Sequence, residues 1–133
     1  MIPSRREQRF YKKAREASSR SNHYKANIGA VIVTGNYVLA EGFNREKSHT
    51  RQHWYDRRMK YHGGQSKLHA EIDALVSSGR VDLTGAEIYI YREDKKDNLA
   101  NCRPCVSCTQ ALKDAGVRHI YYTHKEGYAY EQF

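Results

Sequence analysis

The sequence predicts an α/β fold built on a mixed β-sheet. Short apolar runs of high β-propensity alternate with segments in which apolar residues recur at helical spacing, and glycine-containing turns separate them. Strands that alternate with helices in this way indicate at least one right-handed parallel crossover. The chain has no internal repeat, and its 133 residues are the length of one domain. We therefore expect a single domain over residues 1–133.

The first half of the chain predicts a helix, a hairpin and a long loop. Residues 4–20 place apolar side chains in a narrow helical stripe among many charges, which predicts an amphipathic helix. Residues 28–33 are an apolar run typical of a buried strand, and residues 37–40 form a second strand after a Thr-Gly-Asn turn. Residues 44–67 are polar and basic, which indicates a long loop with a short helix around residues 52–59.

The second half alternates helices and strands. Residues 69–78 have helical periodicity, and residues 86–91 alternate like a strand. A polar insertion over residues 92–100 precedes a helix predicted from Pro104 to Ala115, which a glycine follows as a C-cap. Residues 117–122 predict another strand, and the last eleven residues are polar and rich in tyrosine.

Charge is distributed unevenly along the chain. The formal net charge is +8, and residues 1–25 hold eight Lys and Arg against two acids, while residues 45–67 hold seven against two. Such clustering favours a phosphate-bearing partner, either a nucleotide or a nucleic acid. No stretch approaches the roughly 18–20 apolar residues of a membrane span, and the basic start lacks the apolar run of a signal peptide. We therefore expect a soluble, cytoplasmic protein with no membrane partner.

The cysteines indicate a metal site. All three lie within residues 102–108, an odd number that suits metal or thiol chemistry better than a disulfide framework. Cys105 and Cys108 are spaced i, i+3 at the predicted start of a helix, which makes half of a zinc site. His69 would complete a set of three ligands and leave the fourth tetrahedral position open for water. Glu71 is suitably placed beside it to move protons.

Cys102 leaves an alternative open. The run Cys102, Cys105 and Cys108 is similar to part of an iron–sulfur site, or to a closed Cys3His zinc site completed by His69. Either would suit a non-catalytic nucleic-acid-binding module. Pro104 argues against this alternative, because a helix that begins there leaves Cys102 outside the face that carries the other two thiols.

The candidate ligands fall in two motifs, His69-Ala70-Glu71 and Pro104-Cys105-Val106-Ser107-Cys108. Together they resemble the signature of zinc-dependent nucleobase deaminases. Upstream, residues 28–33 followed by Gly42-Phe43-Asn44 resemble the hairpin that precedes the zinc motif in deoxycytidylate deaminases and in tRNA adenosine deaminases. The resemblance covers about residues 25–123. It implies a cytidine deaminase-like fold, which is a three-layer α/β/α sandwich around a mixed sheet of four to five strands.

The resemblance also implies a zinc cofactor, a homo-oligomer, and roles for residues at the matching positions. These are zinc ligation by His69, Cys105 and Cys108, proton transfer by Glu71, a sugar or base contact by Asn44, and a base contact by the backbone of Ala70. The sequence departs from the family's pattern in two places. Too few residues follow the last predicted strand for the final helix and parallel strand of the tRNA-editing branch, although Gly127 allows a hairpin return. The insertion at residues 92–100 is longer than the family's usual connection.

The long basic loop favours a free nucleotide as substrate, because deoxycytidylate deaminases also carry extra sequence there. We therefore expect hydrolysis of dCMP to dUMP and ammonia. The alternative is deamination of cytosine or adenine in single-stranded DNA or RNA, because Gly42-Phe43-Asn44-Arg45 is closer in pattern to the tRNA enzymes, and aromatic residues interleaved with positive charge suit single-stranded nucleic acid. For a monophosphate, the candidate cations are Lys25, Arg45 and Arg103.

Overall fold

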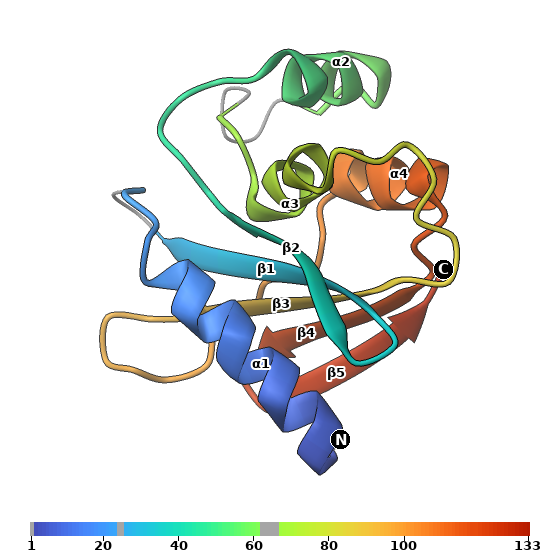
Figure 1. Cartoon of the computed structure of the whole chain (residues 1–133). Helices are drawn as coiled ribbons and strands as arrows, with labels where there is room; N and C mark the ends of the chain where they lie inside the picture. The colour runs from blue at the N-terminus through green and yellow to red at the C-terminus, as the bar shows by residue number, and fades with distance from the viewer. Residues whose placement is uncertain (1, 24–25, 62–66) are drawn as a thin grey trace.

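The computed structural model describes residues 2–23, 26–61 and 67–133. Across these residues, five strands form one mixed sheet in the order β2-β1-β3-β4-β5 (Figure 1). β3 and β4 are parallel, and each other neighbouring pair is antiparallel. The strands are β1 (Asn27–Thr34), β2 (Tyr37–Phe43), β3 (Glu87–Glu93), β4 (His119–His124) and β5 (Gly127–Gln132). The predicted mixed sheet is therefore confirmed.

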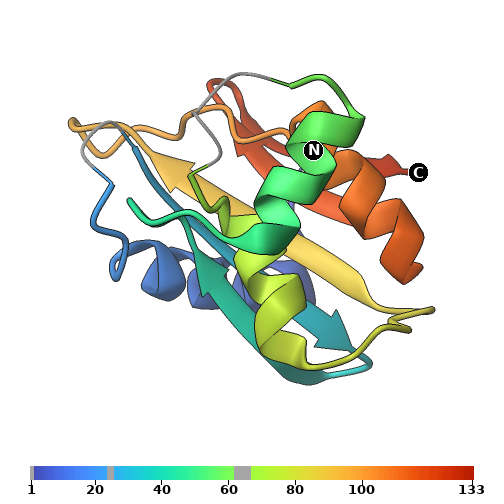
Figure 2. The same cartoon turned by 90° about the horizontal axis from the view of Figure 1, so that it is seen from above.

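Helices cover both faces of the sheet, as Figures 1 and 2 show. α1 (Arg5–Ser18) lies on one face, and α3 (Ala70–Ser78) and α4 (Val106–Ala115) lie side by side on the other. α2 (Thr50–Arg58) lies outside α3 and α4 and packs on α4. α4 connects the parallel strands β3 and β4. The three-layer α/β/α sandwich is thus confirmed, with α2 as an added outer element.

β1 shows why the sheet is buried on both faces. Successive side chains of a strand point to opposite faces, so Val31 and Val33 pack toward α1, while Ala30 and Ile32 pack in the core beneath α3 and α4. All four are fully buried. An apolar run without alternation is therefore what a central strand between two helical layers requires.

Two glycines let the helices approach the sheet closely. A Cβ atom on Gly29 of β1 would overlap the carbonyl oxygen of Ala14 in α1. A Cβ atom on Gly42 of β2 would overlap the backbone nitrogen of Ala74 in α3. The second contact fixes the position of α3, whose first turn carries part of the predicted site.

Two helices begin at residues other than those expected. α2 starts at Thr50, before the predicted 52–59, because the ring of His49 accepts a hydrogen bond from the backbone of the next turn and caps the helix. α4 starts at Val106 rather than at Pro104, with Cys105 as its N-cap. Neither helix, nor any other in the described part of the chain, combines the length and hydrophobicity that a membrane crossing requires.

The polar insertion and the C-terminal segment both extend the sheet. β3 continues to Glu93, which forms a bridge with Leu99 across a tight turn, so residues 92–100 are a short excursion rather than an open loop. At the C-terminal end, Gly127 adopts a φ of +135° and the chain returns as β5 against β4. The hairpin return that this glycine allows is confirmed.

Candidate metal centre and active site

His69 is the N-cap of α3 and has extended backbone angles. Its backbone N–H donates to Oε1 of Gln52 in α2 at 3.0 Å. Residues spaced i, i+2 do not share a face of a regular helix. Because His69 lies outside the helical spiral, however, its ring reaches both thiols of α4, and Glu71 lines the same cavity as His69 and Cys105.

The two thiols are set by the first turn of α4. Cys105 is the N-cap, and its sulfur accepts a hydrogen bond from the backbone N–H of Cys108 at 3.5 Å. Cys108 is fully buried, while Cys105 is partly exposed. A helix N-terminus stabilises negative charge through its free N–H groups. The predicted i, i+3 pair therefore lies where thiolates are favoured.

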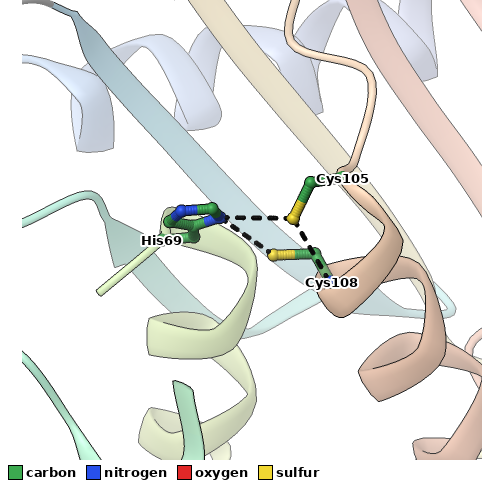
Figure 3. A group of neighbouring side chains, drawn as sticks. All are labelled: His69, Cys105 and Cys108. Carbon is green, nitrogen blue, oxygen red and sulfur yellow. Dashed lines mark hydrogen bonds between the residues drawn. The ribbon is translucent and has the colours of Figure 1, made fainter. Parts of the chain in front are cut away.

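His69, Cys105 and Cys108 converge on one point (Figure 3). Nδ1 of His69 lies 3.5 Å from Sγ of Cys105 and 3.4 Å from Sγ of Cys108, and all three ligand atoms lie within 4.8 Å of one another. Zinc bonds of about 2.3 Å to sulfur and 2.0 Å to nitrogen, at tetrahedral angles, would separate such atoms by roughly 3.5 Å. The group therefore fits a zinc ion with one position left for another ligand.

The charges around this group follow from burial and hydrogen bonding. Hydrogen bonding from Cys108, reinforced by His69, lowers the pKa of the Cys105 thiol to about 4. Burial, together with the neighbouring Cys105 and Glu71, raises the pKa of Cys108. Burial also raises the pKa of Glu71, although the charge of His69 opposes this. One thiol that ionises readily, one thiol that keeps its proton and a carboxyl group whose pKa is raised are thus assembled at one place.

A cavity of about 400 Å³ opens onto this group. Its lining includes His69, Ala70, Glu71 and Cys105, so most of the predicted centre faces a space of the size that ligand sites have. Ala70 is the first residue of α3, so its backbone lies at the free N–H end of that helix. Two of the three predicted ligands, the predicted proton carrier and this backbone thus share one cavity.

Asn44 also lines the cavity and is almost fully buried. Its Oδ1 accepts from the backbone N–H of Ile28 at 2.9 Å and from the hydroxyl group of Ser21, and its Nδ2 donates to the carbonyl group of Ala26 at 2.7 Å. These bonds hold the amide rigidly at the cavity wall. One of the two Nδ2 hydrogens is used by Ala26, and an amide group carries a second.

Arg45 is placed differently from what we expected. Its guanidinium group lies over the ring of Phe43 and pairs with Asp73 at 3.1 Å. Among the described residues, the cavity lining does not include Arg45. Adjacent residues on extended backbone point to opposite sides, so an inward-facing Asn44 places Arg45 outside. The structure thus does not bring this cation to the site.

The other two predicted cations have different outcomes. Arg103 lines the cavity, and its Nε donates to the carboxylate of Glu131 in β5 at 3.0 Å. Hydrogen bonding to Glu131 raises the pKa of Arg103. Lys25 lies outside the described residues.

Sequence reasoning missed several polar residues of the cavity wall: His23, Tyr61, Lys67, Arg92 and Asn101. Arg92 donates to the carbonyl group of Asn101 at 3.0 Å, so the two flank the excursion after β3. One sequence feature could have indicated Arg92. It lies at the charged end of β3, and the segment after it leads directly to the predicted zinc-binding cysteines. Nothing local distinguished the other residues from a solvated surface.

Cys102 lies apart from the three ligand candidates. Its sulfur is 3.2 Å from the hydroxyl oxygen of Thr123, and its backbone N–H donates to the carbonyl group of the same residue at 3.0 Å. Within the described residues, the group close enough to share a metal is His69, Cys105 and Cys108. This geometry disfavours the closed Cys3His alternative.

Comparisons with known proteins agree with this geometry. The family model described as the cytidine and deoxycytidylate deaminase zinc-binding region matches residues 4–124. The deoxycytidylate deaminase of Saccharomyces cerevisiae is 31% identical over 121 residues, which cover 86% of this chain and 36% of that protein. The deoxycytidylate deaminase of Mycobacterium phage D29 is 27% identical over 121 residues, covering 82% and 87%.

The fold comparison gives the same result. The apo structure of dCMP deaminase from cyanophage S-TIM5 has a TM-score of 0.63 and 25% identity, with 92% of this chain and 84% of that chain covered. The chain spans little more than a third of the yeast relative, 36% of its length. Since the family model matches nearly the whole sequence, including both halves of the metal centre, the chain belongs to the family defined by the zinc-binding region of cytidine and deoxycytidylate deaminases.

Proposed function

We propose that this chain is a zinc-dependent nucleotide deaminase that hydrolyses dCMP to dUMP and ammonia. The observation that carries the proposal is the His69, Cys105 and Cys108 group, whose spacing suits zinc and leaves one position open toward a cavity. An open position distinguishes catalytic from structural zinc sites. The yeast and phage relatives, both named deoxycytidylate deaminase, support the choice of substrate.

In this proposal the three residues hold zinc through Nδ1 of His69 and the two sulfurs. Bound zinc lowers the pKa of a coordinated water from 15.7 to about 7, which supplies a nucleophile at neutral pH. The thiol groups must lose their remaining proton for both sulfurs to bind. The lowered pKa of Cys105 means that one of them is already ionised near neutral pH.

Glu71 moves the protons. Its carboxyl group is buried, and burial raises its pKa above the usual value, which favours the protonated form through which a proton carrier must pass. It would take one proton from the attacking water and pass it to N3 of the cytosine ring. It would then take the second proton of that water from the hydroxyl group added to C4 and pass it to the amine, which leaves as ammonia when the C4–N bond breaks. The N–H groups at the start of α3 and the amide of Asn44 line the same cavity and position the base and the sugar.

The phosphate group calls for cations at the cavity wall, and Lys67, Arg92 and Arg103 line it. Arg103 is the candidate that we favour, because it pairs with Glu131 through Nε and its side chain is more than half exposed, at 55%. A free monophosphate bound in this way would be distinguished from its nucleoside by charge.

The test is a substrate panel. Protein loaded with one equivalent of zinc is incubated with dCMP, deoxycytidine and a single-stranded oligonucleotide that contains both cytosine and adenine. Chromatography of the products and an ammonia assay should show dUMP and ammonia from dCMP, with the oligonucleotide unchanged. If micromolar protein releases no ammonia from dCMP, the proposal fails. Deamination of the oligonucleotide alone would establish the polynucleotide alternative instead.

A homo-oligomer and a partner role for single-stranded nucleic acid remain predictions. The pairing of Arg45 with Asp73 removes one cation on which the nucleic-acid alternative depended. Light scattering of the zinc-loaded protein measures the oligomeric state directly.

A further inference from the structure

A second cavity adjoins the one onto which the metal centre opens. Its volume is about 520 Å³, against about 400 Å³ for the first. Among the described residues, three line both cavities: His23, Ala26 and Arg92. The two spaces therefore lie side by side and meet at these side chains. The proposed deamination of dCMP uses the first cavity and leaves the second without a role.

The polar insertion that follows β3 forms much of the wall of the second cavity (Figure 1). Oδ1 of Asp94 accepts hydrogen bonds from the backbone N–H groups of Lys96 and Asn98, at 2.8 Å and 2.9 Å, and these bonds hold the turn. The wall is thus an ordered turn. Besides the three shared residues, the described lining consists of Asn27, Glu93, Asp94, Lys95 and Lys96.

The carboxylates of the second cavity are engaged, whereas its lysines are not. Glu93 pairs with Arg15 of α1 at 3.0 Å and accepts a hydrogen bond from the hydroxyl group of Tyr91. In the part of the chain that the structure describes, the ammonium groups of Lys95 and Lys96 form neither a hydrogen bond nor an ion pair. The cavity therefore offers unpaired positive charge.

Arg92 lies at the boundary of the two cavities and has donors to spare. Its Nη1 donates to the carbonyl group of Asn101 at 3.0 Å, while its Nε is buried and has no hydrogen-bond partner among the described residues. A guanidinium group carries five N–H donors in a rigid fork, and a buried donor without an acceptor is costly. The backbone N–H of Arg92 donates to Oγ1 of Thr123 at 3.1 Å, and its carbonyl group accepts from Ala100 at 3.0 Å. A firmly held arginine with an unpaired donor calls for an acceptor.

Phosphate is the acceptor that this set of side chains suits. Arginine binds it through its fork, and lysine binds it as a point charge. A terminal phosphate group carries roughly 1.5–2 negative charges at neutral pH, whereas a bridging phosphate of a nucleic-acid strand carries one. Three cations without an ion pair, Arg92, Lys95 and Lys96, therefore favour the terminal phosphate of a nucleotide over the bridging phosphate of a strand.

We propose that the second cavity is a phosphate subsite, which lets the active site bind cytosine nucleoside diphosphates as well as monophosphates. The inference rests on the proposed function, which places the base and the first phosphate in the first cavity. Two linked phosphates share a bridging oxygen, so Arg92, which borders both cavities, can contact both of them. The second phosphate then lies against Lys95 and Lys96. The subsite makes and breaks no bond.

The experiment measures the dissociation constants of dCMP and dCDP for the zinc-loaded protein by calorimetry. The compared proteins are wild type and two double variants. Lys95→Gln with Lys96→Gln removes two charges from the subsite. Lys12→Gln with Lys125→Gln removes the same charges from α1 and from the turn before β5, outside the described lining of both cavities. All four lysines are exposed, so neither double change should disturb the fold.

The quantity compared is the preference for dCDP, which is the ratio of the two dissociation constants. In wild type dCDP should bind about 10–100-fold more tightly than dCMP, the effect of a further hydrogen bond to a charged group. Loss of Lys95 and Lys96 should reduce this preference roughly 5–30-fold, because each exposed ion pair contributes up to about 1 kcal/mol. The control variant should keep the preference of wild type within about twofold.

A wild-type preference below about twofold, or an equal decrease in both double variants, would overturn the inference. So would a loss of affinity for a cytosine-containing oligonucleotide in the Lys95 and Lys96 variant with dCDP unaffected, which would assign the cavity to a neighbouring nucleotide. Zinc content is measured after each titration, and binding heat that accompanies loss of zinc would count against the subsite. In each of these cases dCMP is still bound and deaminated. A wild-type protein that neither binds nor deaminates dCMP would contradict the proposed function itself.

Discussion

Nδ1 of His69 lies 3.4 Å from Sγ of Cys108, although the two residues are 39 positions apart in the chain. Each belongs to the start of a helix, and both helices lie on the same face of the sheet. The metal group therefore depends on the relative placement of α3 and α4, and not on either motif alone. Changes to the chemistry of the group and changes to the placement of its helices should have separable effects.

Replacement of Glu71 by glutamine tests the chemistry alone. The glutamine side chain would keep the volume of the native one but could not carry a proton, and Glu71 is not among the three residues that converge as ligands. We expect stoichiometric zinc by atomic absorption and a fall in kcat for dCMP of about 10²–10⁴-fold. A variant that loses its zinc would show that Glu71 supports the site structurally, and near-normal kcat would remove it from the mechanism.

Cys102 should be dispensable for metal binding. Burial raises the pKa of its thiol to about 12, and its sulfur contacts Thr123 rather than the ligand group. Cys102→Ser should retain one zinc per chain, whereas Cys108→Ser should lose it. In wild type at pH 8, Cys102 should also resist iodoacetamide until the protein unfolds, as mass spectrometry can measure. Loss of zinc in Cys102→Ser would revive the closed Cys3His alternative.

The helices and most strands could be predicted from the sequence because their signals are local. An apolar run that is buried on both faces, as in β1, and a glycine C-cap, as at Gly116, are visible without any tertiary context. β5 is different, because Gly127–Gln132 is short and polar and gains its structure only by pairing with β4. The start of α2 was likewise hidden, since it depends on a cap from His49.

The same distinction applies to the site. The spacing of Cys105 and Cys108 indicated a metal half-site, whereas His69 was one possible third ligand that the resemblance to a family then singled out. The cavity wall was less predictable, because Arg92 and Lys67 reach it through the end of β3 and an isolated bridge to Ser48. Arg45 was wrongly expected at the cavity. It follows Asn44 in the sequence, but neighbouring side chains on extended backbone point to opposite sides.

The contact between α2 and α4 should depend on pH. Hydrogen bonds from Tyr55 and Gln110 lower the pKa of Asp114 below its usual value. A lowered pKa contributes stability above the unfolded-state value of about 4, and this contribution disappears as the pH falls through the folded-state pKa. Tyr55→Phe should therefore lower the thermal midpoint at pH 7 and have a smaller effect near pH 3. A difference between variant and wild type that does not change over this range would contradict the assignment.

Substitutions of two glycines test whether the metal site depends on the placement of α3 or equally on that of α1. Added methyl groups in a tightly packed contact cost about 1–3 kcal/mol, so Gly42→Ala and Gly29→Ala should both lower the free energy of unfolding measured in urea. Gly42→Ala pushes on α3 near Ala70 and Ala74, and Gly29→Ala pushes on α1 on the opposite face. We expect a loss of zinc affinity and of kcat only in Gly42→Ala. Equal losses in both variants would show that the site follows global stability and not helix position.

Substitutions of Arg103 and Arg45 compare a cation that lines the cavity with one that lies outside it. Arg103 lines the cavity, whereas Arg45 is held by Asp73 and Phe43. Hydrogen bonds to a charged group contribute about 1.5–3 kcal/mol, so the loss of one to the phosphate group should raise KM roughly 10–100-fold. We expect that increase for dCMP in Arg103→Gln, no change for deoxycytidine, which has no phosphate group, and near wild-type KM in Arg45→Gln. If Arg103→Gln impaired dCMP and deoxycytidine equally, Arg103 would act through the fold of the cavity wall, and Lys67 and Arg92 would be the remaining phosphate contacts among its described residues.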